Sequence, residues 1–196
     1  HGYTNKYGNR ALVGIDATTS TLEENSIGLN EIIEIAREKK RVSRIVIIAD
    51  CGFGNIGKDG FDVFGDYTPK EPTPLPYSDE NVIIWVPNQG IEGSPSFSLA
   101  QQGLFSYLVA GSLRGWADGS LNGEKDGILT MGEAQAYVQQ NIVLLGWPLK
   151  PSLHEKEETQ DWIIRDNRLE EAPQSETFTL LSKDMRARRF SEAEMY

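Results

Sequence analysis

The chain carries one cysteine, Cys51, and two histidines, His1 and His154. A cysteine becomes a nucleophile when a base draws off its proton, and imidazole is the side chain best suited to this task near neutral pH. His1 is followed by Gly2 and stands 50 residues before Cys51, whereas His154 lies in a charged segment that is typical of a solvated surface. The pattern indicates cysteine chemistry with His1 as the candidate base, and it leaves open a buried, inert thiol at Cys51.

The elements that would position Cys51 are a buried strand before it and a glycine loop after it. Residues 45–48 are all isoleucine or valine, which is typical of a strand in a parallel sheet. Gly52, Gly54 and Gly57 follow, and they predict a sharp bend or a close approach of the backbone. In open α/β sheets, catalytic groups gather just past the carboxyl ends of the strands. Cys51 occupies such a position.

The rest of the chain alternates between candidate strands and helices, an order that indicates an α/β fold. The expected elements are strands at 11–15, 81–86, 161–165 and 177–181 and helices at 26–40, 98–113 and 131–143, with irregular structure at 146–160. The long connection 52–80 contains aromatic residues that either line a cleft or pack the loop onto its own domain. These aromatic residues are Phe53, Phe61, Phe64, Tyr67 and Tyr77.

Composition limits the classes of partner. The 196 residues are 39% hydrophobic and carry a net charge of -10, so a folded domain is expected. The acidic balance argues against nucleic acids and anionic membrane surfaces, because both attract basic patches. No apolar run approaches the roughly 18 residues that would cross a membrane. A single cysteine allows no internal disulfide.

Several segments, in this order, resemble the bacterial caspase-like peptidases, which are the metacaspase and orthocaspase relatives of the caspases. The matching segments are His1-Gly2, the strand 11–15 with Asp16-Ala17, residues 26–37, the run 44–51, the helix 103–115 and the loop and helix 122–138. The resemblance implies a caspase-like three-layer α/β sandwich with a mostly parallel sheet. In it, residues 1–150 would form the catalytic domain and residues 151–196 a C-terminal extension.

The family cleaves peptide bonds with a Cys–His dyad, and caspase-type sites place the histidine about 50 residues before the cysteine. By position, the resemblance makes Cys51 the nucleophile and His1 the general base and acid. It also implies an oxyanion hole from the backbone N–H groups of Gly2 and Cys51, since two fixed donors stabilise a developing oxyanion. We therefore expect a cysteine endopeptidase of regulated proteolysis that acts on proteins or peptides and requires no cofactor for its chemistry.

One position departs from the family pattern. Metacaspases carry an aspartate two residues before the cysteine, where it pairs with an arginine or lysine of the substrate. Here that position is Ala49, and the aspartate is Asp50, one residue later. On a strand, a shift by one residue turns a side chain to the opposite face. Asp50 is therefore either a substrate-binding residue or a buried structural acid.

A second constellation, residues 122–133, nearly fits the calcium loop D-x-[DN]-x-[DN]-G-x5-E. The candidate ligands, in the order of the loop, are Asn122, Glu124, Asp126, the carbonyl of Ile128, and Glu133. The asparagine and the glutamate at the first and third positions depart from the pattern. The alternative is a turn closed by a capping box, because Thr130 and Glu133 have the spacing that caps a helix. The sequence leaves both interpretations open.

Two other functions stay open: an inactive caspase-like module that binds partners, and a calcium-binding structural domain. In the family, core strands precede the His-Gly pair. We therefore expect upstream sequence, in the same polypeptide or as a separate chain, to complete the sheet. Without it, the strand at 44–50 would expose a long apolar edge with unpaired N–H and C=O groups, and the ring of His1 would have nothing upstream to hold it near its partner.

Overall fold

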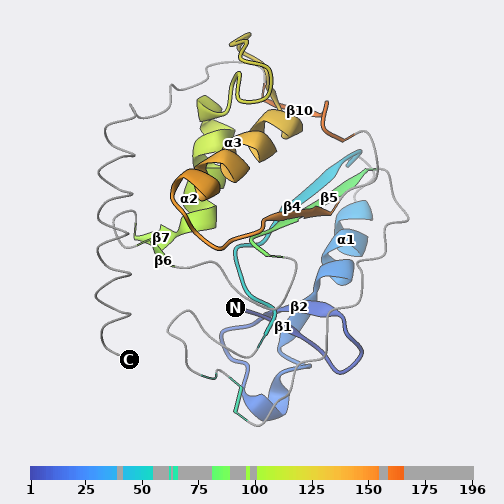
Figure 1. Cartoon of the computed structure of the whole chain (residues 1–196). Helices are drawn as coiled ribbons and strands as arrows, with labels where there is room; N and C mark the ends of the chain where they lie inside the picture. Colours follow the sequence, from blue (N-terminus) through green and yellow to red (C-terminus); the bar gives the residue numbers. More distant parts are fainter. Residues whose placement is uncertain are drawn as a thin grey trace, which may run out of the picture. The chain divides into compact units, whose positions relative to one another are not determined.

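In the computed structural model, the described residues are 1–38, 42–54, 62, 64–65, 81–88, 96–97, 101–154 and 159–165. The chain divides into two compact units. The first holds His1–Ser96 and Leu149–Thr159, and the second holds Phe97–Pro148 and Gln160–Tyr196. Figure 1 shows that both units combine helices with short strands. The structure confirms a mixed α/β fold with small, partly parallel sheets.

The first unit contains a three-stranded sheet in the order β4-β5-β9. β4 (Ile45–Ile48) and β5 (Val82–Val86) run parallel to each other, which confirms the two strands predicted from apolar runs. The burial expected at 45–48 is wrong, because β4 lies at the edge of the described sheet and its side chains alternate between half-buried and exposed. β9 (Ser152–His154) pairs with β5 in the antiparallel direction. The prediction of irregular structure at 146–160 is therefore wrong for these three residues.

An antiparallel sheet in the order β1-β2-β3 precedes the parallel pair in sequence. β1 (Gly2–Thr4) and β2 (Arg10–Val13) form a hairpin, and the side-chain oxygen of Asn5 accepts two backbone N–H bonds in its turn. A short 3-10 helix, Thr19–Thr21, follows β2. The strand predicted at 11–15 is confirmed in part. Figure 1 places the N-terminus directly at the start of β1.

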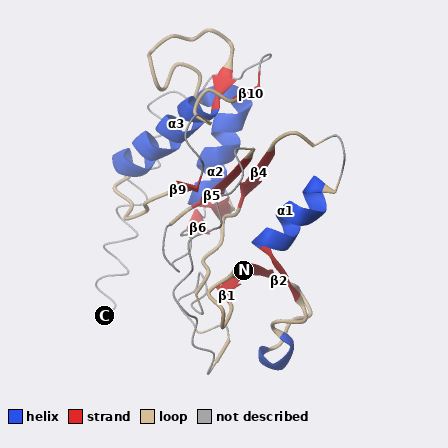
Figure 2. Ribbon diagram, turned by 90° about the vertical axis from the view of Figure 1, so that its right-hand side faces the viewer, coloured by secondary structure: helices blue, strands red, loops and turns tan. Residues whose placement is uncertain are grey.

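The helix of the first unit, α1 (Leu29–Arg37), lies beside the β4–β5 pair, as Figure 2 shows. Leu29 and Ile33 of this helix are buried in one cluster with Ile84 and Val86 of β5. The four side chains share this cluster because residues four apart lie on one face of a helix, and residues two apart on one face of a strand. One face of the sheet is thereby covered by α1.

The predicted helix at 26–40 begins later than expected. Ser26–Gly28 forms β3, which pairs with β2 along its whole length. Gly28 keeps an extended backbone, with φ -69° and ψ 143°, and is the N-cap of α1. The ladder with β2 uses the backbone hydrogen-bonding groups of these residues, so they do not join the helix. Residues 39–41, at the predicted helix end, lie outside the described residues.

Two helices that pack against each other form the second unit. α3 (Met131–Leu144) confirms the helix predicted at 131–143. α2 (Leu104–Gly111) is shorter than the predicted 98–113 and continues into a π-helical turn at Ser112–Trp116. Residues 98–100 lie outside the described part of the chain.

The remaining strands are short. They are β6 (Ser96–Phe97), β7 (Gln102–Gly103), β8 (Leu129–Thr130) and β10 (Ile163–Arg165). β10 pairs antiparallel with β8, which confirms part of the strand predicted at 161–165. The strand predicted at 177–181 lies outside the described residues.

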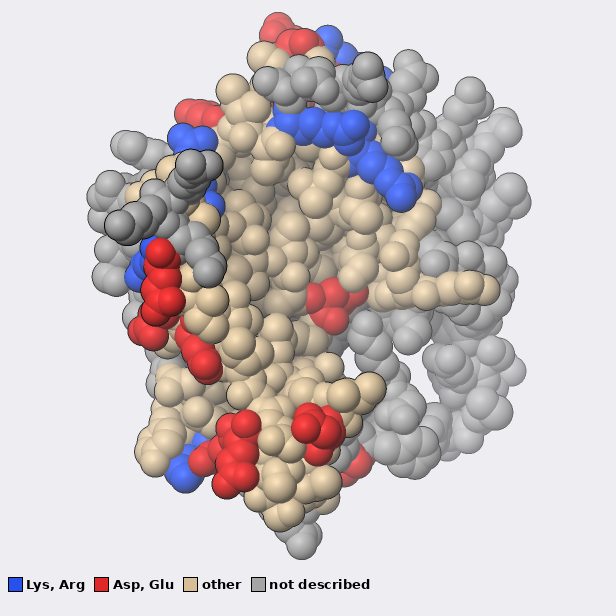
Figure 3. Space-filling model, turned by 180° about the vertical axis from the view of Figure 1, so that it is seen from behind, with Lys and Arg blue, Asp and Glu red and all other residues tan. Residues whose placement is uncertain are grey.

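Acidic side chains lie in separate groups on the face of the molecule that Figure 3 shows. Figure 3 shows acidic side chains gathered in several small clusters on one face, with uncharged surface between them. On this face the acidic side chains are therefore spread over several places rather than collected in one patch. Within the described parts of the chain, no helix is long and apolar enough to cross a membrane.

Candidate active site

The first strand and the segment that follows Cys51 are joined by hydrogen bonds. The backbone N–H of Gly2 donates to the carbonyl of Gly52 over 3.1 Å. The ring nitrogen Nε2 of His1 lies 3.1 Å from the carbonyl oxygen of Gly54. These contacts join residues about 50 positions apart in the sequence. The structure thus brings the candidate base next to the segment that begins with the candidate nucleophile.

The hydrogen bond to Gly54 fixes the tautomer of His1. A carbonyl oxygen only accepts hydrogen bonds, so Nε2 must carry the proton in this contact. In the neutral imidazole, the other nitrogen, Nδ1, then holds the lone pair. Nδ1 is therefore the atom of His1 that can take up a proton.

His1 is also held at its backbone and through an aromatic contact of its ring. The carbonyl of His1 accepts a 2.9 Å hydrogen bond from the N–H of Val13, which extends the β1–β2 ladder by one residue. The His1 ring makes an edge contact with Phe64, with ring centroids 5.5 Å apart and an interplanar angle of 61°. Gly54 and Phe64, both downstream in the sequence, therefore hold the ring of His1. The expected upstream segment stays a prediction.

Cys51 is a half-buried thiol, not engaged in a disulfide, just past the end of β4. The N–H of Ala49 donates to the carbonyl of Trp85 over 3.0 Å, so the parallel ladder continues beyond Ile48. Cys51 packs against the cluster that α1 forms with the sheet. The thiol is thus placed at a carboxyl end of the parallel pair and is not sealed inside the core.

The backbone passes unusually close to itself at Gly2. A Cβ atom at this position would lie 2.8 Å from Cδ1 of Phe53 and 2.9 Å from the carbonyl oxygen of Gly52. Two residues further along β1, the buried hydroxyl of Thr4 donates to the carbonyl of Phe53 over 2.9 Å. Three successive carbonyls, those of Gly52, Phe53 and Gly54, are therefore bonded by residues 1–4. Only a glycine fits at position 2 without moving this segment.

Two residues near the site were not assigned a role from the sequence. Arg10 is buried, with its guanidinium 5.6 Å from the centre of the Phe53 ring. Phe64 was one of five aromatic residues in the long connection, and no spacing rule distinguished it from the others. Phe61, Tyr67 and Tyr77 lie outside the described residues. Asp50, the candidate substrate-binding residue, is half-buried beside Cys51.

The second constellation, in the other unit, forms a capping box at the start of α3. The buried carboxylate of Glu133 accepts hydrogen bonds from the N–H of Gly119 and from both the N–H and the hydroxyl of Thr130, all between 2.9 and 3.0 Å. The N–H of Glu133 in turn donates to the Thr130 hydroxyl oxygen over 3.2 Å. Both carboxylate oxygens therefore have partners within the chain.

The other candidate ligands of this loop also bond to the backbone nearby. The side-chain oxygen of Asn122 accepts from the N–H of Glu124 over 2.9 Å, and Oδ1 of Asp126 accepts from the N–H of Ile128 over 2.8 Å. Across the described ranges, no three His, Cys, Asp or Glu side chains converge as a metal site would require. The geometry supports a turn and a helix start.

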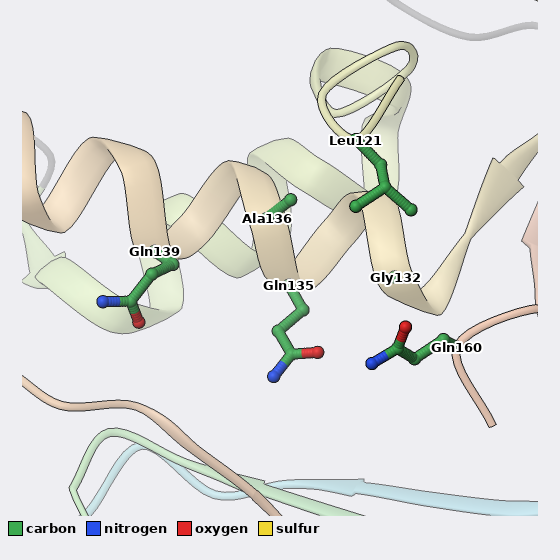
Figure 4. Close-up of a pocket in the computed structure, with 6 residues that line it drawn as sticks. All are labelled: Leu121, Gly132, Gln135, Ala136, Gln139 and Gln160. Atoms are coloured by element: carbon green, nitrogen blue, oxygen red, sulfur yellow. The ribbon is translucent and has the colours of Figure 1, made fainter. Parts of the chain in front are cut away.

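A small pocket lies in the second unit, between α3 and the loop before it. Its volume is about 200 Å³, and it is lined by Leu121, Gly132, Gln135, Ala136, Gln139 and Gln160. Figure 4 shows the amide groups of Gln135 and Gln160 turned toward the same space, with Leu121 above them. The lining holds no titratable or nucleophilic side chain, so it is not a candidate for catalysis.

Comparison with known proteins does not assign the chain to a family. A scan of protein-family models and a search of curated proteins each found no match. The function is therefore argued from the residues around His1 and Cys51.

Proposed function

We propose that this protein is a cysteine endopeptidase of the caspase-like type, with His1 and Cys51 as its catalytic dyad. The observation that supports the proposal most strongly is the hydrogen bond between Nε2 of His1 and the carbonyl of Gly54. It holds an imidazole against the segment that starts at the only cysteine of the chain, and it directs the proton-accepting role to Nδ1.

The reaction follows from these two groups. Nδ1 of His1 takes the proton from Sγ of Cys51, and the thiolate attacks the carbonyl carbon of the scissile peptide bond. The C–N bond then breaks, and the imidazolium of His1 gives its proton to the leaving amine. Water, deprotonated by the same imidazole, attacks the carbonyl carbon of the thioester. The C–S bond breaks, and the imidazolium returns its proton to the thiolate, so the acid and the free thiol are released.

The proposed oxyanion hole requires a change in hydrogen bonding. Its donors are the N–H groups of Gly2 and Cys51, and that of Gly2 is bonded to the carbonyl of Gly52. A substrate carbonyl reaches Gly2 only when it replaces Gly52 as the acceptor. Fixed donors of this kind stabilise the transition state by several kcal/mol. The replacement of the Gly52 carbonyl by the substrate carbonyl is therefore a required part of productive binding.

Asp50 is the proposed determinant of substrate preference. Its carboxylate would favour lysine or arginine before the cleaved bond, because charge pairing in a half-buried site contributes more than on the surface. Ala49, which stands where metacaspases carry their aspartate, is buried in the cluster with α1. The acidic group therefore comes from a different backbone position. A peptide library that contrasts Lys and Arg with Asp and uncharged residues tests this preference.

A second candidate function is an inactive caspase-like module that binds partners. The observation in its favour is that Gly2 N–H and His1 Nε2 are both bonded to carbonyls of the chain itself. In a module that only binds partners, these two groups can stay bonded to the backbone of the chain, because no substrate has to replace it. The two functions differ in whether peptide bonds are cleaved.

The experiment is a peptide-cleavage assay on four purified chains. We expect cleavage by the unaltered chain, no cleavage by Cys51→Ala, and at least a 100-fold loss of kcat in His1→Gln, which lacks the base. His154→Gln is the matched control and should cleave at the unaltered rate. Cleavage that survives in Cys51→Ala, or an equal loss in both histidine variants, would contradict the dyad. Absence of cleavage in the unaltered chain would favour the binding module.

A further inference from the structure

Phe64 contacts two aromatic side chains of the N-terminal strand at once. Its ring meets His1 edge-on at a centroid distance of 5.5 Å and an interplanar angle of 61°. It meets Tyr3 in the same manner at 5.9 Å and 64°. Phe64 is 4% exposed and Tyr3 is 2% exposed. The candidate base therefore belongs to a row of three rings, with Phe64 in the middle.

The extended backbone of β1 explains this row. Side chains two residues apart on a strand point to the same face, so His1 and Tyr3 present their rings side by side. Phe64 comes from the connection after Cys51 and is held by its own neighbourhood. Its N–H donates to Oδ1 of Asp62 over 2.9 Å, and Gly65, with φ 60°, turns the chain directly after it.

We propose that Phe64 is a positioning residue for the imidazole of His1. This inference rests on the proposed function, in which Nδ1 of His1 is the base. The bond from Nε2 to Gly54 restrains one atom of the ring, but a single hydrogen bond still allows the ring plane to tilt. The edge contact with Phe64 fixes the plane and hence the direction in which Nδ1 points. Tyr3 supports Phe64 from the other side.

The kinetic test compares Phe64→Leu with Phe64→Tyr. Leucine keeps an apolar side chain but removes the aromatic ring, so we expect kcat to fall roughly 10- to 100-fold with KM nearly unchanged, as for a misplaced catalytic group. Tyrosine keeps the ring and should restore most of kcat. Phe105→Leu, a fully buried aromatic residue of the second unit, controls for loss of stability alone and should leave kcat unchanged at a temperature where the chain stays folded.

A second measurement does not depend on activity. The chain has two histidines, so its NMR spectrum contains two sets of imidazole C–H signals, and His154→Gln identifies those of His1. We expect the His1 signals to carry a ring-current shift that disappears in Phe64→Leu and persists in Phe64→Tyr.

The outcomes separate the two proposals. Unchanged His1 signals in Phe64→Leu, or changed signals with unchanged kcat, would overturn the positioning role even if the chain is a peptidase. Changed signals in a chain that cleaves no peptide would confirm the contact and refute the proposed function, and the catalytic role of Phe64 would fall with it.

Discussion

Replacing Gly2 with alanine tests the close approach of β1 to the segment after Cys51. The new Cβ would lie 2.8 and 2.9 Å from Cδ1 and Cε1 of Phe53 and 2.9 Å from the carbonyl oxygen of Gly52. Phe53 is 1% exposed, and the Gly52 atom belongs to the backbone, so neither neighbour can move without disturbing the core. Overpacking of this kind costs about 1–3 kcal/mol. We expect that loss of unfolding free energy.

Denaturant unfolding followed by circular dichroism measures the loss, and peptide cleavage measures its effect on the site. Gly28→Ala is the matched control, because its Cβ would have no neighbour closer than 4.0 Å. At this N-cap, replacing glycine with alanine lowers the unfolding free energy by at most about 1 kcal/mol. We expect kcat to fall in Gly2→Ala and to stay unchanged in Gly28→Ala. A Gly2→Ala variant with the stability and kcat of the unaltered chain would refute the close packing.

Three further predictions concern other parts of the molecule. If residues 122–133 bind calcium, millimolar calcium raises the melting temperature and Glu133→Ala abolishes the rise; no calcium effect would leave capping as the role of Glu133. β4 is an edge strand of the described sheet, and its Ile48 is 38% exposed. Light scattering should therefore show that the chain alone self-associates, and that the Ile48→Lys variant self-associates less. A monomer at high concentration would argue against an open edge. The pKa of the Tyr137 phenol is raised from its ordinary 10.0, mainly by burial and secondly by the charge of the nearby Tyr107. At high pH the folded chain therefore keeps a proton that the unfolded chain releases. Stability should therefore fall above about pH 10; Tyr137→Phe should lessen that fall, and an identical pH profile in both chains would contradict it.

The parts of the fold that the sequence predicts are those with a strong local pattern. The apolar run before Cys51 predicts a strand in a parallel sheet, and the structure has β4 there, parallel to β5, although its side chains alternate between half-buried and exposed. α3 is predicted almost to the residue, because Thr130 and Glu133 mark its start and form the capping box. Local pattern and tertiary structure agree at these positions.

The parts that the sequence does not predict depend on distant partners. β9 contains a serine and a histidine and shows no apolar run, but pairing with β5 makes it a strand. Ile27 matches the apolar spacing of α1, but pairing with Leu12 of β2 holds it in β3. The contact of Phe64 with His1 likewise joins residues more than 60 positions apart. No periodicity within one segment encodes such contacts.

The most direct test of the His1–Cys51 dyad is the rate at which iodoacetamide alkylates Cys51 at pH 7, followed by intact-mass spectrometry. Ordinary thiols have a pKa of about 8.5 and are only a few per cent ionised at this pH, whereas a thiol with a base beside it reacts faster. Because the chain has a single cysteine, every added mass reports on Cys51. We expect labelling at least tenfold faster than that of free glutathione, a loss of this advantage in His1→Gln, and no change in His154→Gln. Equal rates in all three chains, at or below the rate of glutathione, would refute the dyad.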